Sequence, residues 1–246
     1  MMLYDIHCHM LPGLDDGAFS MDESVLMAEM AASHHERAVV CTPHWLPDSD
    51  YDLRTLLGVL QKTGSVLRER GIRLKLIAGQ EIFLDENYRE TVGLLESSRL
   101  LTINRSVYPL VEFSPYVSEH LVYSSIGYLT ARGFILIIAH PERYRFVIED
   151  PSVLKRMKNL GAFLQMNKGS VSGFFGGSVR RTAEYMLSAR LADFAASDAH
   201  SPYRRTPPLN ELHEWLSVNC SMRYADFLLC ENPLRVLKNE RIYSYT

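Results

Sequence analysis

Short apolar runs alternate along the chain with longer segments of helical periodicity. Seven of these runs are rich in strand-forming residues, and they cover 3–6, 38–41, 74–78, 107–113, 134–139, 162–166 and 192–196. Runs of this length without polar alternation are typical of parallel strands that are buried on both faces. The pattern therefore predicts a sheet of parallel strands in the interior of the protein.

The segments between the apolar runs predict helices. The clearest covers 21–35, where Ser20 and Glu23 have the spacing of a capping box. Further helical patterns cover 52–69, 118–132, 151–160 and 179–189. A strand followed by a helix, repeated about seven times without a break in composition, predicts an α/β barrel or a doubly wound sheet, and one domain over 1–246.

Glycine gathers in one place after the sixth apolar run. Gly169, Gly173, Gly176 and Gly177 lie within nine residues. Such a concentration predicts one flexible glycine-rich loop, and most loops of this kind are turns. The segment lacks the G-x-x-x-x-G-K-[ST] pattern, so it is not a nucleotide-binding P-loop.

Composition narrows the functional classes. Lys and Arg total 26 against 29 Asp and Glu, and the resulting net charge of -3 gives no basic field for nucleic acid. The chain has no run of about 20 apolar residues, so we expect a cytoplasmic protein without stable membrane insertion. Cys8, Cys41, Cys220 and Cys230 form no C-x-x-C pair, which predicts reduced thiols and no thiolate zinc site.

Metal-ligand residue types occupy the C-terminal ends of nearly all the predicted strands. They are His7 and His9 at the first run, His44 after the second, Glu81 after the third, Glu112 at the fourth, His140 after the fifth, and Asp198 with His200 after the seventh. In a barrel of parallel strands these ends meet on one face, where active sites are built. A lone histidine beside a strand is more often a packing residue, but this many buried polar groups need a counter-ion. The sequence therefore predicts a metal site.

The composition of this set indicates catalysis. His7 and His9, like Asp198 and His200, are two residues apart, so in an extended segment both members of each pair point the same way and can reach one ion. Imidazole and carboxylate ligands without thiolate suit manganese, iron or zinc in open coordination. A carboxylate such as Glu81 can bridge two ions about 3.5 to 4 Å apart.

The segments around these residues resemble the motifs of the PHP superfamily. They are DIHCHMLPGLDDGA, CTPHW, AGQE, VEF, AHPERY, GAFLQMNKGS and SDAHSPYRRTPP. The resemblance is strongest to bacterial manganese-dependent tyrosine phosphatases of capsule and exopolysaccharide operons, and it runs from Asp5 to about Pro208 and onward to ENPLRVL. It implies a single distorted (βα)7 barrel of the PHP type with the metal site at the C-terminal ends of the strands.

The same resemblance implies two or three divalent ions, manganese first, with iron or zinc as alternatives. The implied ligands are His7, His9, Glu81 and Asp198 for the first ion, Glu81, Glu112 and His140 for the second, and Asp16, His44 and His200 for the third. Asp15 lies in the same tight loop as Asp16, and the family pattern favours Asp16.

The implied reaction is hydrolysis of a phosphate monoester by metal-activated water. Arg143, and either Arg205 or its neighbour Arg204, correspond to arginines that contact phosphate in the family. His44 or His200 would protonate the leaving group. The implied substrate is a phosphotyrosine protein, with the tail of a bacterial tyrosine kinase as the expected partner in the control of polysaccharide biosynthesis.

Two alternatives stay open, and other classes are excluded. The chain could instead act on a small metabolite such as histidinol phosphate, or be an inactive metal-binding scaffold that regulates polysaccharide assembly. The PHP skeleton also serves exonucleases, which the charge balance disfavours. A cysteine-dependent phosphatase would need Arg six positions after its cysteine, and these positions hold Leu14, Pro47, Asp226 and Val236.

Overall fold

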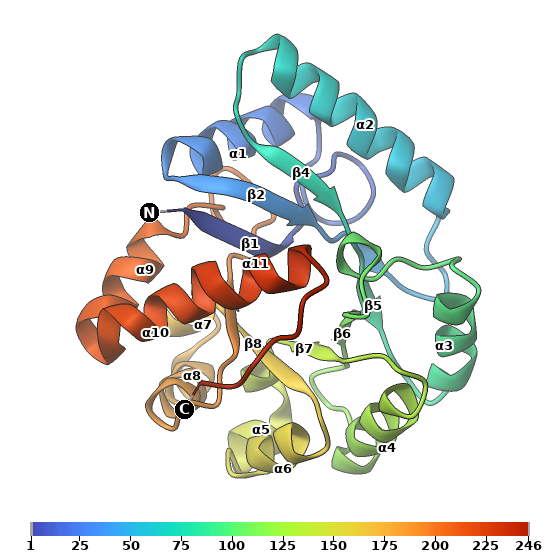
Figure 1. Ribbon diagram of the computed structural model, residues 1–246, viewed down its shortest axis with the longest axis vertical. Helices are drawn as coiled ribbons and strands as arrows, with labels where there is room; N and C mark the ends of the chain where they lie inside the picture. Colours follow the sequence, from blue (N-terminus) through green and yellow to red (C-terminus); the bar gives the residue numbers. More distant parts are fainter. Residues whose placement is uncertain (1, 246) are drawn as a thin grey trace.

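The computed structural model describes residues 2–245, in which parallel strands are surrounded by helices (Figure 1). One sheet has the order β1-β2-β4, from Leu3–Cys8, Glu36–Cys41 and Lys75–Ala78. The other has the order β3-β5-β6-β7-β8-β9, from His44–Trp45, Glu81–Phe83, Leu110–Glu112, Ile137–Ala139, Phe163–Asn167 and Phe194–Ala196. All the paired strands are parallel, which confirms that prediction.

Two of the predicted strands continue beyond a break into the second sheet. Thr42 and Pro43 separate β2 from β3, and Gly79 and Gln80 separate β4 from β5. Pro43 has no amide hydrogen to donate, and a Cβ at Gly79 would lie 2.8 Å from a methyl of Val40. These breaks were not predicted. Their consequence is that β3 and β5 pair at their first residues, His44 and Glu81.

The five predicted helices are present, at α1 (Met21–Ser33), α2 (Leu53–Glu69), α4 (Glu119–Thr130), α6 (Val153–Asn159) and α8 (Gly177–Ser188). The Ser20 side chain accepts a hydrogen bond from the amide of Glu23 at the start of α1, as its capping pattern predicts. The unpredicted helices are α3 (Tyr88–Glu96), α5 (Arg145–Glu149), α7 (Lys168–Val171), α9 (Asn210–Leu216), α10 (Met222–Asp226) and α11 (Asn232–Leu237). Among residues 2–245, no helix has the length and apolar character needed to cross a membrane.

The predicted glycine-rich loop is divided by structure, so that prediction is wrong for two of its four glycines. Gly169 lies inside α7 and Gly177 is the first residue of α8. Only Gly173 and Gly176 lie in the turn between them, both with positive φ, at 81° and 95°. Gly169 serves close packing instead, because a Cβ there would lie 2.8 Å from the Phe175 ring.

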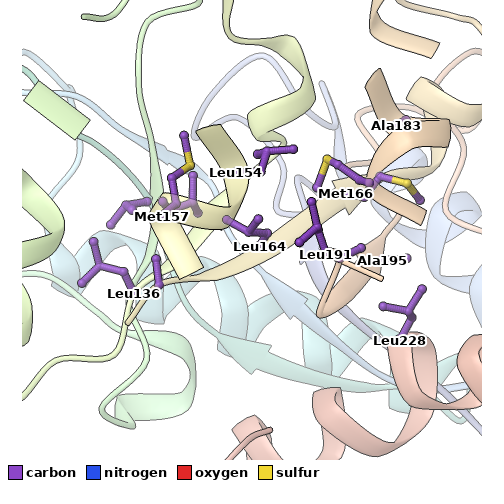
Figure 2. Packing of buried hydrophobic residues seen from close by; sticks show 14 of the residues in the cluster. Leu136, Leu154, Met157, Leu164, Met166, Ala183, Leu191, Ala195 and Leu228 are labelled. Atoms are coloured by element: carbon purple, nitrogen blue, oxygen red, sulfur yellow. The ribbon is translucent and has the colours of Figure 1, made fainter. Parts of the chain in front are cut away.

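Alternation along the strands separates two environments. On β8, Leu164 and Met166 point outward and belong to the same core cluster as Leu154 and Met157 of α6 and Ala183 of α8 (Figure 2). Each buried Leu or Met side chain of this cluster contributes about 1.5–3 kcal/mol. Packing against the outward face of the strands thus holds the surrounding helices in position.

The other face of the strands forms a second cluster that joins residues from both sheets. Its members include Ile6, Val40, Ile77, Leu110, Ile137, Ala139, Phe194 and Ala196. Two residues after Leu110 comes Glu112, and two residues after Ala196 comes Asp198. Residues two apart in a strand point to the same face, so the inward face of these strands is apolar at first and polar at the C-terminal end.

Candidate metal centre

Side chains from several strand ends converge on the carboxylate of Glu81, which is fully buried at the start of β5. Its Oε2 lies 3.1 Å from His7 Nε2, 3.3 Å from His9 Nε2 and 3.0 Å from His44 Nδ1. Its Oε1 lies 2.8 Å from His140 Nε2. The structure thus brings together residues as far apart in the sequence as His7 and His140.

Three overlapping groups of ligand atoms, each within 4.8 Å, lie at this centre. They are His7, His9, Glu81 and Asp198; His44, Glu81 and Glu112; and His9, Asp16, His44 and His200. The first group has the same members as the first ligand set that the resemblance implies. The third contains the implied third set and adds His9.

The second group differs from its implied set, because His44 takes the place of His140. The His44 Nδ1 lies 2.8 Å from Glu112 Oε1. His140 borders the same carboxylates, with Nε2 2.8 Å from Glu81 and 3.9 Å from Glu112. Geometry therefore leaves both histidines within reach of a cation held between Glu81 and Glu112.

The two aspartates of the first loop have different surroundings. The Asp15 carboxylate accepts hydrogen bonds from His9 Nδ1 at 2.6 Å, from the His44 amide at 2.9 Å and from the Gly17 amide at 2.9 Å. Asp16 has a 71% exposed side chain, and its Oδ1 lies 3.3 Å from His200 Nε2 and 3.6 Å from His44 Nε2. Asp15 therefore orients His9, whereas Asp16 belongs to the third group of ligand atoms.

A chain of side-chain amides supports the first group. His7 Nδ1 lies 2.8 Å from Gln165 Oε1, and Gln165 Nε2 donates to Asn167 Oδ1 at 2.8 Å. Asn167 Nδ2 donates to Asp198. A proton on His7 Nδ1 would leave Nε2 free to bind a cation, as in other metal sites whose histidines have such partners. Sequence reasoning missed these two amides, although they share the two-residue spacing of His7 and His9.

Two of the candidate ligands have strained backbones. His140 has φ of 35° and Asp198 has φ of 49°, a left-handed conformation that costs non-glycine residues about 1–3 kcal/mol. Backbone hydrogen bonds hold both: the His140 amide donates to Gln165 O at 2.8 Å, and the Asp198 amide donates to His7 O at 2.9 Å. The neighbouring strands β8 and β1 thus maintain the strain where these side chains turn toward the centre.

The charges of the centre fit divalent cations. Burial alone would lower the pKa of His9, but Asp15, Asp198 and Glu81 raise that pKa well above its usual value. Burial alone would raise the pKa of Glu81, but His7, His140 and His44 hold that pKa well below its usual range. Carboxylates that draw protons onto buried imidazoles would also draw cations, with release of those protons.

Unsatisfied atoms support the same fit. Glu81 Oε2 and His44 Nδ1 are buried, and neither has a partner in hydrogen-bonding geometry among residues 2–245, although they lie 3.0 Å apart. Buried polar atoms rarely lack a partner, and a cation between them would satisfy both. Imidazole and carboxylate donors suit manganese, iron or zinc.

Two arginines stand at the edge of the centre. Arg143 Nη1 lies 3.6 Å from Asp198 Oδ2, and Arg205 Nη2 pairs with the same oxygen. The guanidinium carbons lie 4.6 Å and 5.5 Å from the centre of the Phe175 ring, which packs against both. Arg204 lies over the Phe174 ring instead, so Arg205 is the one of the two neighbouring arginines that reaches the centre.

The cysteines take no part in this arrangement. Cys8 and Cys41 are fully buried in the core cluster under α1 and α2, and burial raises the pKa of both thiols. The free thiol form is expected in each. Cys8 lies between His7 and His9 in the sequence, and its packing in this cluster agrees with the prediction that it serves the core.

Comparison with known proteins gives a consistent result. The family model "Capsular polysaccharide synthesis, CpsB/CapC" matches residues 3–238. Tyrosine-protein phosphatase YwqE of Bacillus subtilis (strain 168) is 32% identical over 249 residues, which cover 98% of this chain and 94% of YwqE. Tyrosine-protein phosphatase CpsB of Streptococcus pneumoniae is 25% identical over 246 residues, covering 98% of this chain and 100% of CpsB.

A solved structure matches over the whole fold. It comes from work on "YwqE from Bacillus subtilis and CpsB from Streptococcus pneumoniae, unique metal-dependent tyrosine phosphatases". The TM-score is 0.91 at 30% identity, with 99% of this chain and 97% of that chain covered.

Proposed function

The chain belongs to the CpsB/CapC family of capsular polysaccharide synthesis proteins, and from this premise we propose that it is a metal-dependent protein-tyrosine phosphatase. The observation that carries the proposal is the convergence of His7, His9, Glu81 and Asp198 beside two arginines that reach one carboxylate. Similarity to solved metal-dependent tyrosine phosphatases supports it.

The proposed ligands are those of the three groups together with His140. Two or three divalent cations, manganese first, would supply a water of lowered pKa and positive charge opposite the phosphoryl oxygens. Asp15 would keep His9 oriented, and Gln165 would keep the Nε2 of His7 turned toward the centre. The carboxylates of Glu81 and Asp198 would hold the cations together.

Arg143 and Arg205 would bind the transferred phosphoryl group. A guanidinium presents paired N–H donors that suit phosphate oxygens, and both groups are partly exposed, at 29% and 23%. Asp198 draws both arginines toward the centre, and Phe175 packs against the face of each. The two guanidinium groups would thus be held in place before substrate arrives.

Hydrolysis adds water across the phosphorus–oxygen bond and yields phosphate and tyrosine. A phenolate needs less help from a general acid than an alkoxide does. His44, 22% exposed, and His200, 8% exposed, lie on the open side of the centre beside Asp16. The proposal gives one of these two imidazoles the role of proton donor to the phenolate.

We also propose that residues 1–246 form one domain, a distorted (βα)7 barrel of the PHP type. Counting β2 with β3 and β4 with β5 gives seven extended segments. A bridge between Cys8 and Ala199 joins β1 to the segment after β9, and the His9 amide donates to Ala199 O at 2.8 Å. The inward cluster that draws on both sheets supports the same description.

The proposed substrate is a phosphotyrosine protein, and the proposed partner is the tail of a bacterial tyrosine kinase in the cytoplasm. The names of the relatives support the chemistry, and the family name supports the link to capsular polysaccharide.

Steady-state kinetics with Mn added after chelation would test the proposal. The kcat/KM for a phosphotyrosine peptide should exceed that for histidinol phosphate and for a single-stranded DNA substrate. Faster turnover of histidinol phosphate would support the metabolite phosphatase instead. Full metal loading without turnover of any substrate would support the inactive scaffold.

A further inference from the structure

A cavity of about 350 Å³ lies next to the metal centre. It opens between α7, the turn that follows it, helix α9 and the loop after β9. Its walls include Val171, Phe174, Phe175, Arg204, Leu212 and Trp215. Leu212 and Trp215 are three positions apart on α9, so one face of this helix forms a wall.

The cavity shares two side chains with the proposed phosphate-binding edge. Arg205 lines the cavity and also pairs with Asp198. Phe175 lines it as well and packs against the guanidinium groups of Arg143 and Arg205. One layer of side chains therefore separates the cavity from the position proposed for the phosphoryl group. Because the two positions share Arg205 and Phe175, a substrate chain bound at the metal centre could place a side chain near its phosphotyrosine in the cavity.

The lining favours an aromatic occupant. Phe174 and Trp215 offer ring faces and edges, and aromatic pairs attract each other beyond the effect of their buried area. Arg204 lies with its guanidinium carbon 5.4 Å from the Phe174 ring, and it forms no ion pair within residues 2–245. A guanidinium without a carboxylate partner is suited to stack on a second ring. The other two basic side chains of the lining already have partners, Lys168 with the carbonyl oxygens of Thr206 and Pro208 and Arg205 with Asp198, which leaves Arg204 for an occupant.

The cavity is held open before any ligand binds. Lys168 donates from Nζ to the carbonyl oxygens of Thr206 and Pro208, which fixes the loop that forms the outer wall. Gly169 lets the Phe175 ring pack against the backbone, since any Cβ there would overlap it. Phe174, which lines the cavity, is 43% exposed. A large exposed aromatic side chain in the wall of a preformed cavity is typical of a binding site.

We infer that this cavity is a subsite for an aromatic side chain that flanks the phosphotyrosine in the substrate protein. The inference rests on the proposed function and adds substrate selectivity to it. The protein would bind the side chain beside the phosphotyrosine in addition to the phosphotyrosine itself.

The test compares two phosphotyrosine peptides that differ only in the flanking residues, phenylalanine in one and glycine in the other. The Mn-loaded protein should prefer the phenylalanine peptide by about tenfold in kcat/KM, as expected for one apolar side chain in a pocket. Trp215→Ala and Arg204→Ala should bring the ratio of the two values close to one. The ratio is taken within each variant, so a loss common to both peptides cancels.

Val218→Ser is the matched control, because Val218 lies shortly after α9 and is 85% exposed. It should keep the wild-type ratio. If Trp215→Ala does not fold, Arg204→Ala and Phe174→Ser, both at exposed positions, decide the question. Equal turnover of the two peptides by the wild type, or an unchanged ratio in these variants, would overturn the subsite but leave the phosphatase proposal intact. Absence of turnover with any phosphotyrosine peptide would overturn both.

Discussion

Replacing Glu81 by glutamine should remove more metal ions per chain than a comparable change at the rim of the metal centre. Within residues 2–245, Glu81 is the one carboxylate whose two oxygens face four different imidazoles, those of His7, His9, His44 and His140. It also belongs to two of the three ligand groups. Asp16→Asn makes the same chemical change at a side chain that is 71% exposed and belongs to one group. The two variants form a matched pair.

The size of the effect follows from the lost charge. A unit charge about 2.1 Å from a divalent cation gains about 4 kcal/mol even at the dielectric constant of water. This corresponds to roughly a thousandfold in the binding constant of each ion that Glu81 contacts. Burial of Glu81 strengthens this attraction, but desolvation of the charges offsets part of the gain, so the figure for water sets the scale of the effect. Water can replace the exposed Asp16 carboxylate, so its loss should weaken one ion.

Elemental analysis of the purified variants after dialysis measures the outcome, together with kcat for p-nitrophenyl phosphate. Glu81→Gln should retain at least two fewer ions per chain than the wild type, and Asp16→Asn at most one fewer. Circular dichroism should show that both variants are folded. Equal metal loss in the two variants, or a larger loss in Asp16→Asn, would refute the bridging role of Glu81.

Three further predictions test the chemistry and the electrostatics. Chelation should abolish turnover and Mn should restore it. Alkylating reagents should leave turnover largely intact, because burial raises the pKa of all four thiols. Activity that survives complete metal removal would contradict the mechanism. Arg143→Ala should lower kcat/KM by a factor that corresponds to about 1.5–3 kcal/mol, with metal content unchanged. The control Arg145→Ala, at a 69% exposed side chain, should have little effect. Metal loss in Arg143→Ala would make Arg143 a structural ion-pair partner. Burial raises the pKa of Glu36 from 4.5 to about 8, so the folded state holds a proton that the unfolded chain releases above pH 4.5. The free energy of unfolding should therefore fall as pH rises from 4.5 to 8. Urea melts at pH 5 and pH 8 should show this fall in the wild type and not in Glu36→Gln, and an equal fall in both proteins would exclude Glu36 as its source.

The candidate ligands could be predicted because each stands next to a strong local signal. His7, Glu112 and Asp198 lie at the ends of apolar runs, and parallel strands bring such ends together. The exact partition into ligand groups could not be predicted in the same way. His44 takes the place of His140 beside Glu112 because β3 and β5 pair at His44 and Glu81, and this pairing depends on breaks at Pro43 and Gly79 that the apolar pattern does not reveal.

Supporting residues were harder to predict than ligands. Asp15 owes its role to the His44 amide, which is 29 positions away, so no local pattern distinguishes Asp15 from Asp16. Gln165 and Asn167 carry no charge, and in the sequence they resemble ordinary strand residues with polar side chains. Their role depends on which face of β8 points inward, and that is settled by the packing of Leu164 and Met166 on the opposite face (Figure 2).

The glycine-rich segment shows why composition alone misjudged the structure beside Arg143 and Arg205. Glycine can mark flexibility, a turn with positive φ or a close approach between backbone and side chain, and the sequence gives the same letter for all three. Gly173 and Gly176 are turn glycines, whereas Gly169 makes room for Phe175. Because Phe175 packs against the guanidinium groups of Arg143 and Arg205, a methyl group at Gly169 would displace the ring that both arginines rest on. A segment that the sequence presents as loose is therefore part of the rigid support of the arginines.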